Sequence, residues 1–418
     1  MDNLTHGLAG MLLADVTVEA LTPRGTEVDR RFRYRARWAS AVANNLPDLD
    51  FMLRRLTSGR VGYLLHHRGH SHTLVVGLVL GSLAYVVLRA VFRAPSGVPA
   101  RRERLTLLAL CLAGPWLHIA ADFSNNYGVH PFWPVYDAWV YGDAVFIIEP
   151  LFWVLTVPAL ALGSTHRATK LLLAGIVAVG LALAWVTRFA NVGTAAFLTL
   201  AALGFGAWNL RAAQRTRTFV ALGASLAVAL TFFVASAVAR AEVSEALRQG
   251  AAPGTPPIVL ADTSLMPAPS NPFCWAAMSA GRRGDRYELL VATVALAPKL
   301  VPLEWCELEP TGHTLPLAIA SVAATASVRW DGEWSAPLAE LGALYRDNCE
   351  ARAYLRWARL PFWLEHSAEL LLGDLRYDRE VGLDFAETVG TLPPRSCPKR
   401  VPPWTPPRLD LIETKEPP

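Results

Sequence analysis

The sequence has little charge. Only 18% of its 418 residues are Asp, Glu, Lys or Arg, whereas 53% are hydrophobic. This balance is too apolar for an ordinary soluble protein. The apolar residues gather before about residue 240, in runs of roughly 18 to 24 residues, the length of a helix that crosses a bilayer. These runs are residues 73–92, 105–121, 145–163, 170–187, 192–210 and 218–239. The sequence therefore predicts an integral membrane protein.

The start of the chain lacks the basic region that opens a secretory signal peptide. The first apolar stretch, residues 7–20, contains Asp15 and Glu19. We expect this stretch to form a short or partly inserted helix that stays in the mature protein. The net charge of +4 comes largely from arginine in loops beside the membrane, so it gives no reason to expect a nucleic-acid partner.

Cysteine is scarce, with five in the chain. Cys111 lies in an apolar run, where we expect it to pack as a small hydrophobic residue. The other four follow the last apolar run and lack the CxxC spacing of a metal ribbon or a redox pair. They are Cys274, Cys306, Cys349 and Cys397. Two disulfides are possible in any of three pairings, and they would require an oxidising compartment.

Lysine and arginine are absent from residues 122–144. The other connecting segments are basic, namely residues 21–37, 93–104, 164–170 and 211–217. Cytoplasmic loops carry an excess of Lys and Arg, so the basic loops should be cytoplasmic and residues 122–144 should face outward. The last spanning run then delivers the C-terminal third outside the membrane. Residues 51–69 disagree, because this outward segment carries four arginines.

Histidine is concentrated in one short stretch, His66-His67-Arg68-Gly69-His70-Ser71-His72, which holds four of the ten in the chain. Neutral imidazole is the commonest protein ligand for zinc and related metals. Because adjacent side chains rarely point at the same ion, we assign His67 to the site, with His66 as its alternative. A solvated polar loop is the competing interpretation.

Other histidines and aspartates should reach the same membrane face if the topology is correct. The predicted metal ligands are His6, Asp48, Asp50, His67, His70, His72, His118 and Asp122. His118 and Asp122 are four residues apart and therefore share a helix face. That pair could instead be a hydrogen bond that caps the bundle, and Asp48-Leu49-Asp50 could be a plain turn. Convergence from separate segments favours a metal site.

Eight ligands exceed the four that one tetrahedral zinc needs, so we expect more than one divalent ion, zinc or alternatively manganese. A metal-bound hydroxide would then serve as the nucleophile of a hydrolysis. We assign Arg68 and Asp143 to catalysis, Arg68 to hold an anionic group and Asp143 to orient a ligating histidine. A membrane-surface salt bridge and a plain interfacial residue are the respective alternatives. No phosphate-binding glycine loop or serine nucleophile elbow is present.

Composition changes after residue 240, where proline and polar residues become frequent. Strands are predicted at 287–294 and within 318–330, helix at 336–358, and a strand or hairpin at 366–379. The fold class is mainly α: a polytopic helical membrane bundle followed by a smaller α+β extracytoplasmic domain. The predicted divisions are a metal-site membrane region (1–165), additional transmembrane helices (166–239), an extracytoplasmic α+β domain (240–392) and a proline-rich tail, extended or disordered (393–418).

Several short motifs in residues 1–165 resemble a bacterial family of membrane-bound metal-dependent hydrolases, described in part as LexA-binding, inner-membrane-associated hydrolases. The matching pieces are Met1-Asp2-Asn3-Leu4-Thr5-His6, Leu46-Pro47-Asp48-Leu49-Asp50, His67-Arg68-Gly69-His70-Ser71-His72, His118-Ile119-Ala120-Ala121-Asp122, Asn126-Tyr127-Gly128 and Gly142–Pro150. The resemblance implies a polytopic membrane protein with a metal site. Glu149 departs from the aspartate expected before Pro150.

These observations favour a multi-pass hydrolase of the inner (cytoplasmic) membrane whose site lies at the outer membrane–water interface. The expected partners are the lipid bilayer and a phosphoester or lipid-derived substrate, and no nucleic acid. The aromatic residues of 123–134 suit an interfacial belt or, alternatively, an apolar substrate groove. The alternative function is a non-catalytic metal-binding membrane scaffold that recruits a protein partner.

Overall fold

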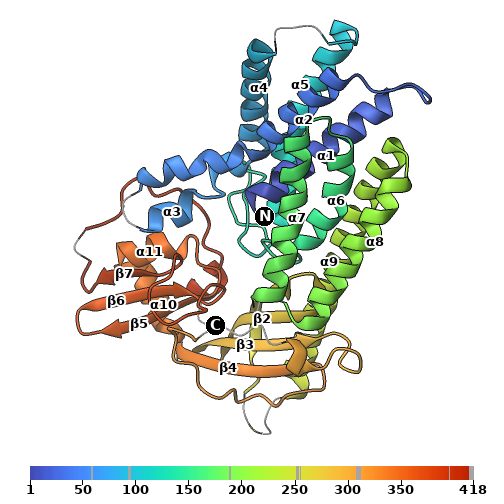
Figure 1. Cartoon of the computed structure of the whole chain (residues 1–418). Coiled ribbons are helices and arrows are strands. Elements are labelled where there is room, and N and C mark those ends of the chain that lie inside the picture. The colour runs from blue at the N-terminus through green and yellow to red at the C-terminus, as the bar shows by residue number, and fades with distance from the viewer. Residues whose placement is uncertain are drawn as a thin grey trace.

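Helices fill the first 249 residues of the computed structural model, and strands dominate the remainder (Figure 1). The structure describes residues 1–57, 60–92, 96–187, 190–250, 254, 256–306, 312–394 and 396–413. The helices are α1 (Asn3–Leu21), α2 (Arg30–Asn45), η1 (Pro47–Arg55), α3 (Arg60–His66), η2 (His70–His72), α4 (Leu74–Val91), α5 (Ala100–Phe123), α6 (Pro150–Leu162), α7 (Arg167–Val186), α8 (Val192–Arg211) and α9 (Gln214–Gln249). The predicted fold class, a helical membrane bundle followed by an α+β domain, is confirmed.

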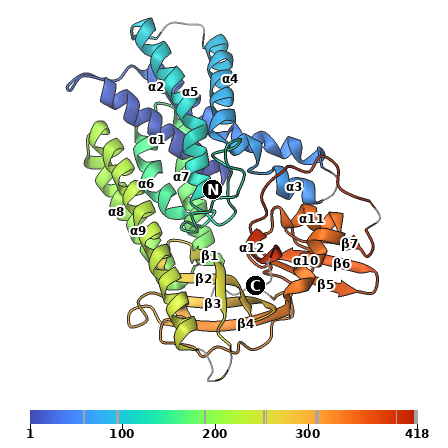
Figure 2. The same ribbon diagram turned by 180° about the vertical axis from the view of Figure 1, so that it is seen from behind.

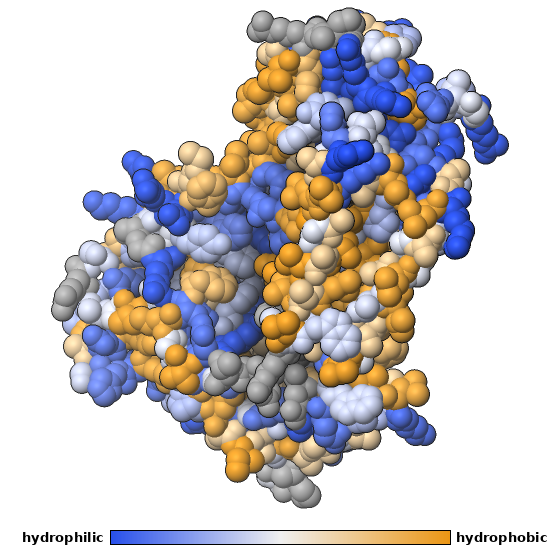
Figure 3. Space-filling view, viewed as in Figure 1, coloured by the Kyte–Doolittle hydropathy of each residue, from blue (hydrophilic) through white to orange (hydrophobic). Residues whose placement is uncertain are grey.

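Six of these helices, α1, α4, α5, α7, α8 and α9, are long and apolar enough to cross a membrane. Much of the surface over α7 and α8 is hydrophobic, as expected for helices that face lipid (Figure 3). The run predicted at 145–163 forms only α6, which begins at Pro150 and has 13 residues. Its shortness follows from irregular structure before Pro150, a residue that suits the first turn of a helix but not its interior.

Helix α1 is longer and more regular than the short helix expected at residues 7–20. It has 19 residues, and its Asp2 cap accepts a hydrogen bond from the Thr5 amide. Its two acidic residues are buried and paired with arginines of α2, Asp15 with Arg37 and Glu19 with Arg33. These ion pairs with α2 compensate the two acidic charges. In the sequence alone, the same charges suggested a helix that is short or only partly inserted.

A four-stranded antiparallel sheet begins the C-terminal domain, in the order β1-β2-β3-β4, and a three-stranded antiparallel sheet, β5-β6-β7, follows. The elements are β1 (Val259–Ala268), β2 (Asn271–Arg283), β3 (Arg286–Ala295), η3 (Leu303–Cys306), β4 (Val328–Pro337), α10 (Leu338–Asp347), α11 (Cys349–Leu355), β5 (Pro361–His366), β6 (Glu369–Asp374), β7 (Thr388–Thr391) and α12 (Leu409–Ile412). Figure 2 shows the first sheet at the end of the long helix α9 and the second sheet beside α3.

The strand predicted at 287–294 is β3, and the helix predicted at 336–358 is present as α10 and α11. The strand placed within 318–330 is wrong in position, because pairing with β3 begins only at Val328. The expected element in 366–379 is β6, which pairs with β5 as a hairpin. The sequence did not predict β1 or β2, since both contain proline, which strands tolerate mainly at edges and starts.

Two disulfides cross-link the C-terminal domain, Cys274–Cys306 and Cys349–Cys397. This is one of the three pairings that the four cysteines allow. The fifth cysteine, Cys111, is free and buried within α5, as expected.

The described part of the tail after residue 393 contains the short helix α12 and is packed rather than disordered. Trp404 is fully buried and donates from Nε1 to the Leu65 carbonyl at 2.9 Å. Thr405 Oγ1 donates to Asp137 Oδ1 at 2.8 Å, which ties the tail to the loop between α5 and α6. Residues 414–418 lie outside the described residues.

A buried arginine joins the bundle to the C-terminal domain. Arg359, just before β5, donates to both carboxylate oxygens of Asp143 at 2.7 and 2.8 Å. The same guanidinium donates to both oxygens of Asp262 on β1 at 2.7 and 2.9 Å. Asp143 belongs to the loop before α6, so one guanidinium connects a membrane-region loop to both parts of the C-terminal domain.

Replacing this arginine should be costly. We expect Arg359→Ala to lower the free energy of unfolding by about 3–5 kcal/mol, because it leaves two buried or half-buried carboxylates without their main counter-ion. Arg329→Ala is the matched control, since Arg329 pairs with Asp331 at the surface and should cost about 1 kcal/mol or less. Thermal unfolding of the detergent-purified protein measures both. Equal losses in the two variants would contradict the structural role of Arg359.

Candidate metal centre

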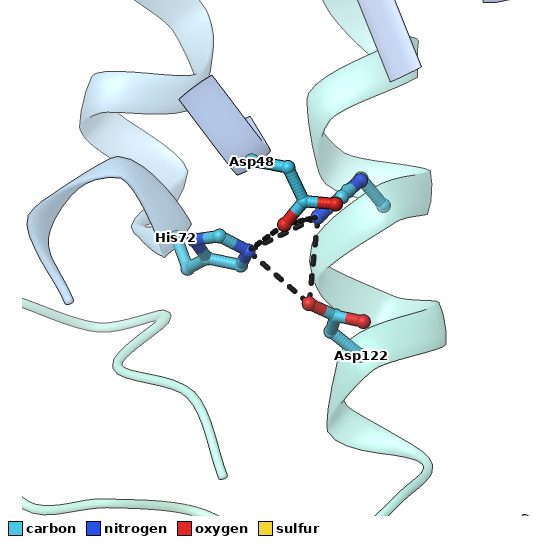
Figure 4. A group of neighbouring side chains, drawn as sticks. Asp48, His72 and Asp122 are labelled. Carbon is cyan, nitrogen blue, oxygen red and sulfur yellow. Dashed lines mark hydrogen bonds and ion pairs between the residues drawn. The ribbon is translucent and has the colours of Figure 1, made fainter. Parts of the chain in front are cut away.

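Four side chains point at a common centre at one end of the bundle: Asp48, His72, His118 and Asp122 (Figure 4). One donor atom from each lies within 4.8 Å of the other three. The residues come from three separate segments, Asp48 from η1, His72 from η2, and the other two from one face of α5. The convergence that the topology predicted is therefore present for these four residues.

The spacing of the donor atoms suits a small divalent ion. His72 Nε2 and His118 Nε2 are 3.0 Å apart. Asp122 Oδ2 lies 3.1 and 3.4 Å from these two nitrogens, and Asp48 Oδ1 lies 3.5 and 3.4 Å from them. Zinc bonds of about 2.0–2.1 Å in a tetrahedron give ligand–ligand separations of about 3.3–3.4 Å. The two imidazoles and two carboxylates therefore form a candidate metal-binding site.

Hydrogen bonds on the far side of each imidazole orient the ring. His118 Nδ1 donates to the Asn44 carbonyl at 2.6 Å, which leaves the Nε2 lone pair directed at the centre. His72 Nδ1 lies 2.9 Å from Ser71 Oγ and 3.3 Å from Asp50 Oδ2. Ligating histidines are commonly held by a carbonyl or carboxylate in this way, and such partners raise the basicity of the ligand.

Close contact between α2 and α5 brings the Asn44 carbonyl to His118. Gly114 of α5 lies against α2, and a Cβ there would come within 2.8 Å of the Asn44 backbone nitrogen and of the Ala43 side chain. Gly10 of α1 lies equally close to α2, since a Cβ added there would come within 2.9 Å of the Ser40 carbonyl oxygen. Glycine at both positions lets the three helices pack tightly enough to share one buried site.

The four side chains are almost completely removed from solvent, with relative exposures of 0% for His72, His118 and Asp122 and 14% for Asp48. Burial alone would lower the pKa of His72, but hydrogen bonds to Asp122, Asp48 and Asp50 outweigh it and raise that pKa to about 10. Burial raises the pKa of the Asp48 carboxyl, but hydrogen bonds from His118 and His72 exceed that effect and hold the pKa below its usual range. The carboxylates of the centre thus stabilise positive charge beside them, as a bound cation would supply.

Arg68 lies directly behind the centre. Its Nε is 2.9 Å from Asp122 Oδ2, and its Nη1 donates to Asn125 Oδ1 at 2.8 Å. The guanidinium carbon lies 5.0 Å from the ring centre of Tyr127. Its backbone φ is 57°, in the left-handed region, and its amide donates to Asp50 Oδ2. Arg68 therefore lies beside the candidate centre. It is paired with the candidate ligand Asp122, whereas the prediction had its guanidinium hold an anionic group of a substrate.

The remaining predicted ligands lie around the four-residue group rather than in it. His6 stacks on His118, with ring centres 3.7 Å apart, and its Nε2 lies 3.1 Å from Asp122 Oδ1. Asp50 accepts hydrogen bonds from the Arg68 amide and Ser71 Oγ and lies beside His72 and His67. Asp122 thus faces the group with one oxygen and His6 with the other. The prediction of more than one ion rested on the count of all eight residues and remains a prediction.

Three histidines of the His66–His72 stretch make other contacts. His67 Nδ1 lies 3.1 Å from Asp50 Oδ1, and its ring lies edge-on to that of His72 with ring centres 6.1 Å apart. His66 Nε2 bonds Thr57 Oγ1 at 2.9 Å. His70 packs against the rings of Trp133 and Trp404, with ring centres 4.8 and 4.6 Å away. Of the four histidines in this stretch, only His72 supplies a candidate ligand atom to the four-residue group.

Asp143 lies elsewhere. Its two oxygens bind Arg359, and Oδ2 also accepts from Arg240 at 2.7 Å. Its side chain thus contacts Arg359 of the C-terminal domain and Arg240 of α9, and neither is one of the candidate ligands.

Sequence reasoning overlooked Asn44, Ser71 and Asn3. Asn44 contributes its carbonyl to His118, Ser71 bonds Asp50, and Asn3 Nδ2 donates to Asp48 Oδ2 at 2.8 Å. The Asn44-Asn45 pair just before Pro47-Asp48 was a weak signal for Asn44. A backbone carbonyl contact leaves no mark on residue type, so it could be found only in the structure.

Comparison with known proteins is informative for the first part of the chain. Residues 1–192 match the family model described as YdjM inner membrane protein. The matched part contains all four residues of the candidate site and is similar to a bacterial inner-membrane family. No curated protein and no solved structure matches the chain.

Metal analysis should separate the candidate ligands from their neighbours. We expect purified protein to retain a divalent ion that His118→Ala and His72→Ala each lose, since each variant removes one of four donors. His70→Ala is the matched control and should keep the ion, because His70 contacts tryptophans instead. Elemental analysis of detergent-purified protein gives the content and the stoichiometry. Loss of metal in the His70 variant, or retention in both of the others, would contradict the assignment.

Proposed function

We propose that this chain is a metal-dependent hydrolase of the cytoplasmic membrane. The observation that carries the proposal is the largely buried set of two imidazole nitrogens and two carboxylate oxygens that lie within 4.8 Å of one another. A divalent ion held there, zinc or manganese, would polarise a substrate oxygen and activate water for hydrolysis. The matched inner-membrane family and the six membrane-length helices support the location.

The chain's own residues would contribute orientation and charge. Asp50 and the Asn44 carbonyl hold the two imidazoles, and Arg68 offsets part of the charge on Asp122. Asp48 is the one ligand whose side chain is partly exposed, so substrate would approach from its side. Figure 3 shows a hollow with largely hydrophilic walls between the bundle and the C-terminal domain, which supports access for a polar group.

The substrate class that fits best is a phosphoester or lipid-derived molecule. An apolar pocket of about 140 Å³ lies between α6, α7 and α8, at the end of the bundle that carries the site. Its wall includes Trp153, whose Nε1 donates to Thr5 Oγ1, and Thr5 precedes His6. A hydrocarbon chain in this pocket would therefore be separated from the residues around the centre by the Trp153 side chain.

We propose that the site and the C-terminal domain lie on the extracytoplasmic face. Two disulfides in that domain support this placement, because disulfides persist in oxidising compartments. The basic loops at the opposite ends of the helices support it as well.

Cysteine reactivity tests the placement. In protein isolated from cells with free thiols blocked at lysis, we expect four cysteines to resist alkylation until a reductant is added, and Cys111 to react only after unfolding. Mass spectrometry counts the labelled cysteines. A Cys349→Ser variant should free Cys397 and provide the control. Alkylation of all four cysteines without reductant would indicate a reducing compartment and overturn the orientation.

The second candidate function is a non-catalytic metal-binding scaffold. The number of protein donors favours it, because a tetrahedral ion with four protein ligands is typical of a structural site, whereas catalytic zinc keeps one position open. The hydrolase proposal requires Asp48, the partly exposed ligand, to yield its position or the ion to accept a further ligand.

Hydrolysis of defined probes decides between the two functions. We expect metal-loaded protein to cleave a chromogenic phosphodiester or a phospholipid in a bilayer, and Asp50→Asn to lower that rate about 10–100-fold with the metal retained, as removal of a ligand-orienting carboxylate does. His70→Ala is the control that should keep the rate. Bound metal without cleavage of either probe would reject the hydrolase and leave the scaffold.

A further inference from the structure

Large apolar side chains project outward from η1 and the residue that follows it. Leu49, Phe51, Met52, Leu53 and Leu56 have relative exposures between 37% and 67%, whereas Pro47 and Asp50 are buried. Single exposed apolar residues are normal, but five within eight residues form a patch of the kind that marks an interaction surface.

The position of η1 indicates what covers this patch. In Figures 1 and 2 the blue helix between α2 and α3 extends sideways from the bundle, from near the end of α4, and lies over α3. Its residues contact α3 most extensively, and also α2, α5 and η2. The apolar patch therefore lies beside the end of the bundle where the membrane-length helix α4 begins and α5 ends.

Charge on η1 supports the same conclusion. Arg54 and Arg55 form its last turn and are exposed. A helix that combines apolar side chains with basic residues and lies beside the ends of spanning helices has the composition of an interfacial segment, which binds anionic lipid through its basic residues. These are two of the four arginines that disagreed with the charge-based topology, and an interfacial position accounts for these two.

We propose that η1 is seated in the headgroup layer of the bilayer, with its apolar side chains at the acyl boundary and Arg54 and Arg55 beside anionic phospholipid headgroups. Asp48, in the first turn of η1, then lies at headgroup depth. This inference does not depend on hydrolysis, because it concerns only where η1 sits. It would also place the exposed side of the candidate centre next to lipid headgroups.

Fluorescence quenching in bilayers tests the depth of η1. The full chain carrying Cys111→Ala and Met52→Cys is labelled with an environment-sensitive fluorophore and reconstituted into vesicles of phosphatidylcholine and phosphatidylglycerol. Val179→Cys on α7 is the lipid-facing control, and Ile319→Cys, which is 95% exposed in the C-terminal domain, is the aqueous control. Lipids brominated near the headgroup should quench the Met52 probe but not the Ile319 probe.

Two results would overturn the proposal. Quenching of the Met52 probe by aqueous iodide and not by brominated lipid would place η1 in water. Protection from both quenchers would mean that protein, such as a second copy of the chain, covers η1. Leu56→Cys provides a second labelling site if Met52→Cys does not fold.

The proposed contact of Arg54 and Arg55 with anionic headgroups has its own test. Brominated phosphatidylglycerol should quench the Met52 probe more than brominated phosphatidylcholine at equal mole fraction, and Arg54→Gln/Arg55→Gln should abolish that difference. Arg329→Gln, on the C-terminal domain, is the matched control and should preserve it. An unchanged preference in the double variant would reject the role of the two arginines.

Discussion

A carboxylate buried in a helical bundle must be compensated, and Asp122 is the carboxylate around which this end of the molecule is arranged. Its oxygens face His72, His118, His6 and Arg68, which come from η2, α5, α1 and the turn before η2. Leaving such a group without partners would cost several kcal/mol. Packing at the end of the bundle therefore has to bring these four segments together, and the candidate metal centre is the result.

A second layer of contacts holds that arrangement. Asp50 accepts hydrogen bonds from the Arg68 amide and from Ser71 Oγ, and it lies beside Nδ1 of His72. The turn between α3 and η2 therefore closes around one carboxylate. Arg68 adopts a left-handed backbone conformation there, which costs energy for a residue with a side chain. The ion pair with Asp122 and the hydrogen bond from the Arg68 backbone amide to Asp50 offset that cost. The strained backbone of Arg68 is thus tolerated because the turn places the side chains of the site.

The C-terminal domain supports the site from behind. Arg359 connects Asp143 to Asp262, and Trp404 inserts its ring beside the His66–His72 stretch, where it contacts His130 at 3.9 Å between ring centres. Gly69 lies against the Trp404 ring, so the closing turn of the site rests on a residue more than 300 positions later in the chain. The domain thus belongs to the architecture of the site even though the family match ends at residue 192.

Sequence alone determined the membrane-spanning character, the position of the second domain and the set of side chains from which the centre is drawn. Long apolar runs and the scarcity of charge decide the first two, because a bilayer imposes length and composition on each helix independently of the others. Pairing decides strand positions, which is why β4 begins at Val328 and not earlier. Irregular structure before Pro150 is why the apolar run at 145–163 forms only the short helix α6.

Tertiary structure alone decided which histidines and aspartates meet. Residue type cannot distinguish His72 from His70, since the same stretch directs one ring to Asp122 and the other to two tryptophans. Asp48 and Asp50 differ only by facing opposite sides of His72. Those directions follow from the close packing of α2 on α5 and from the docked tail, which are contacts between residues far apart in sequence. A pattern read along one chain contains no information about such distances.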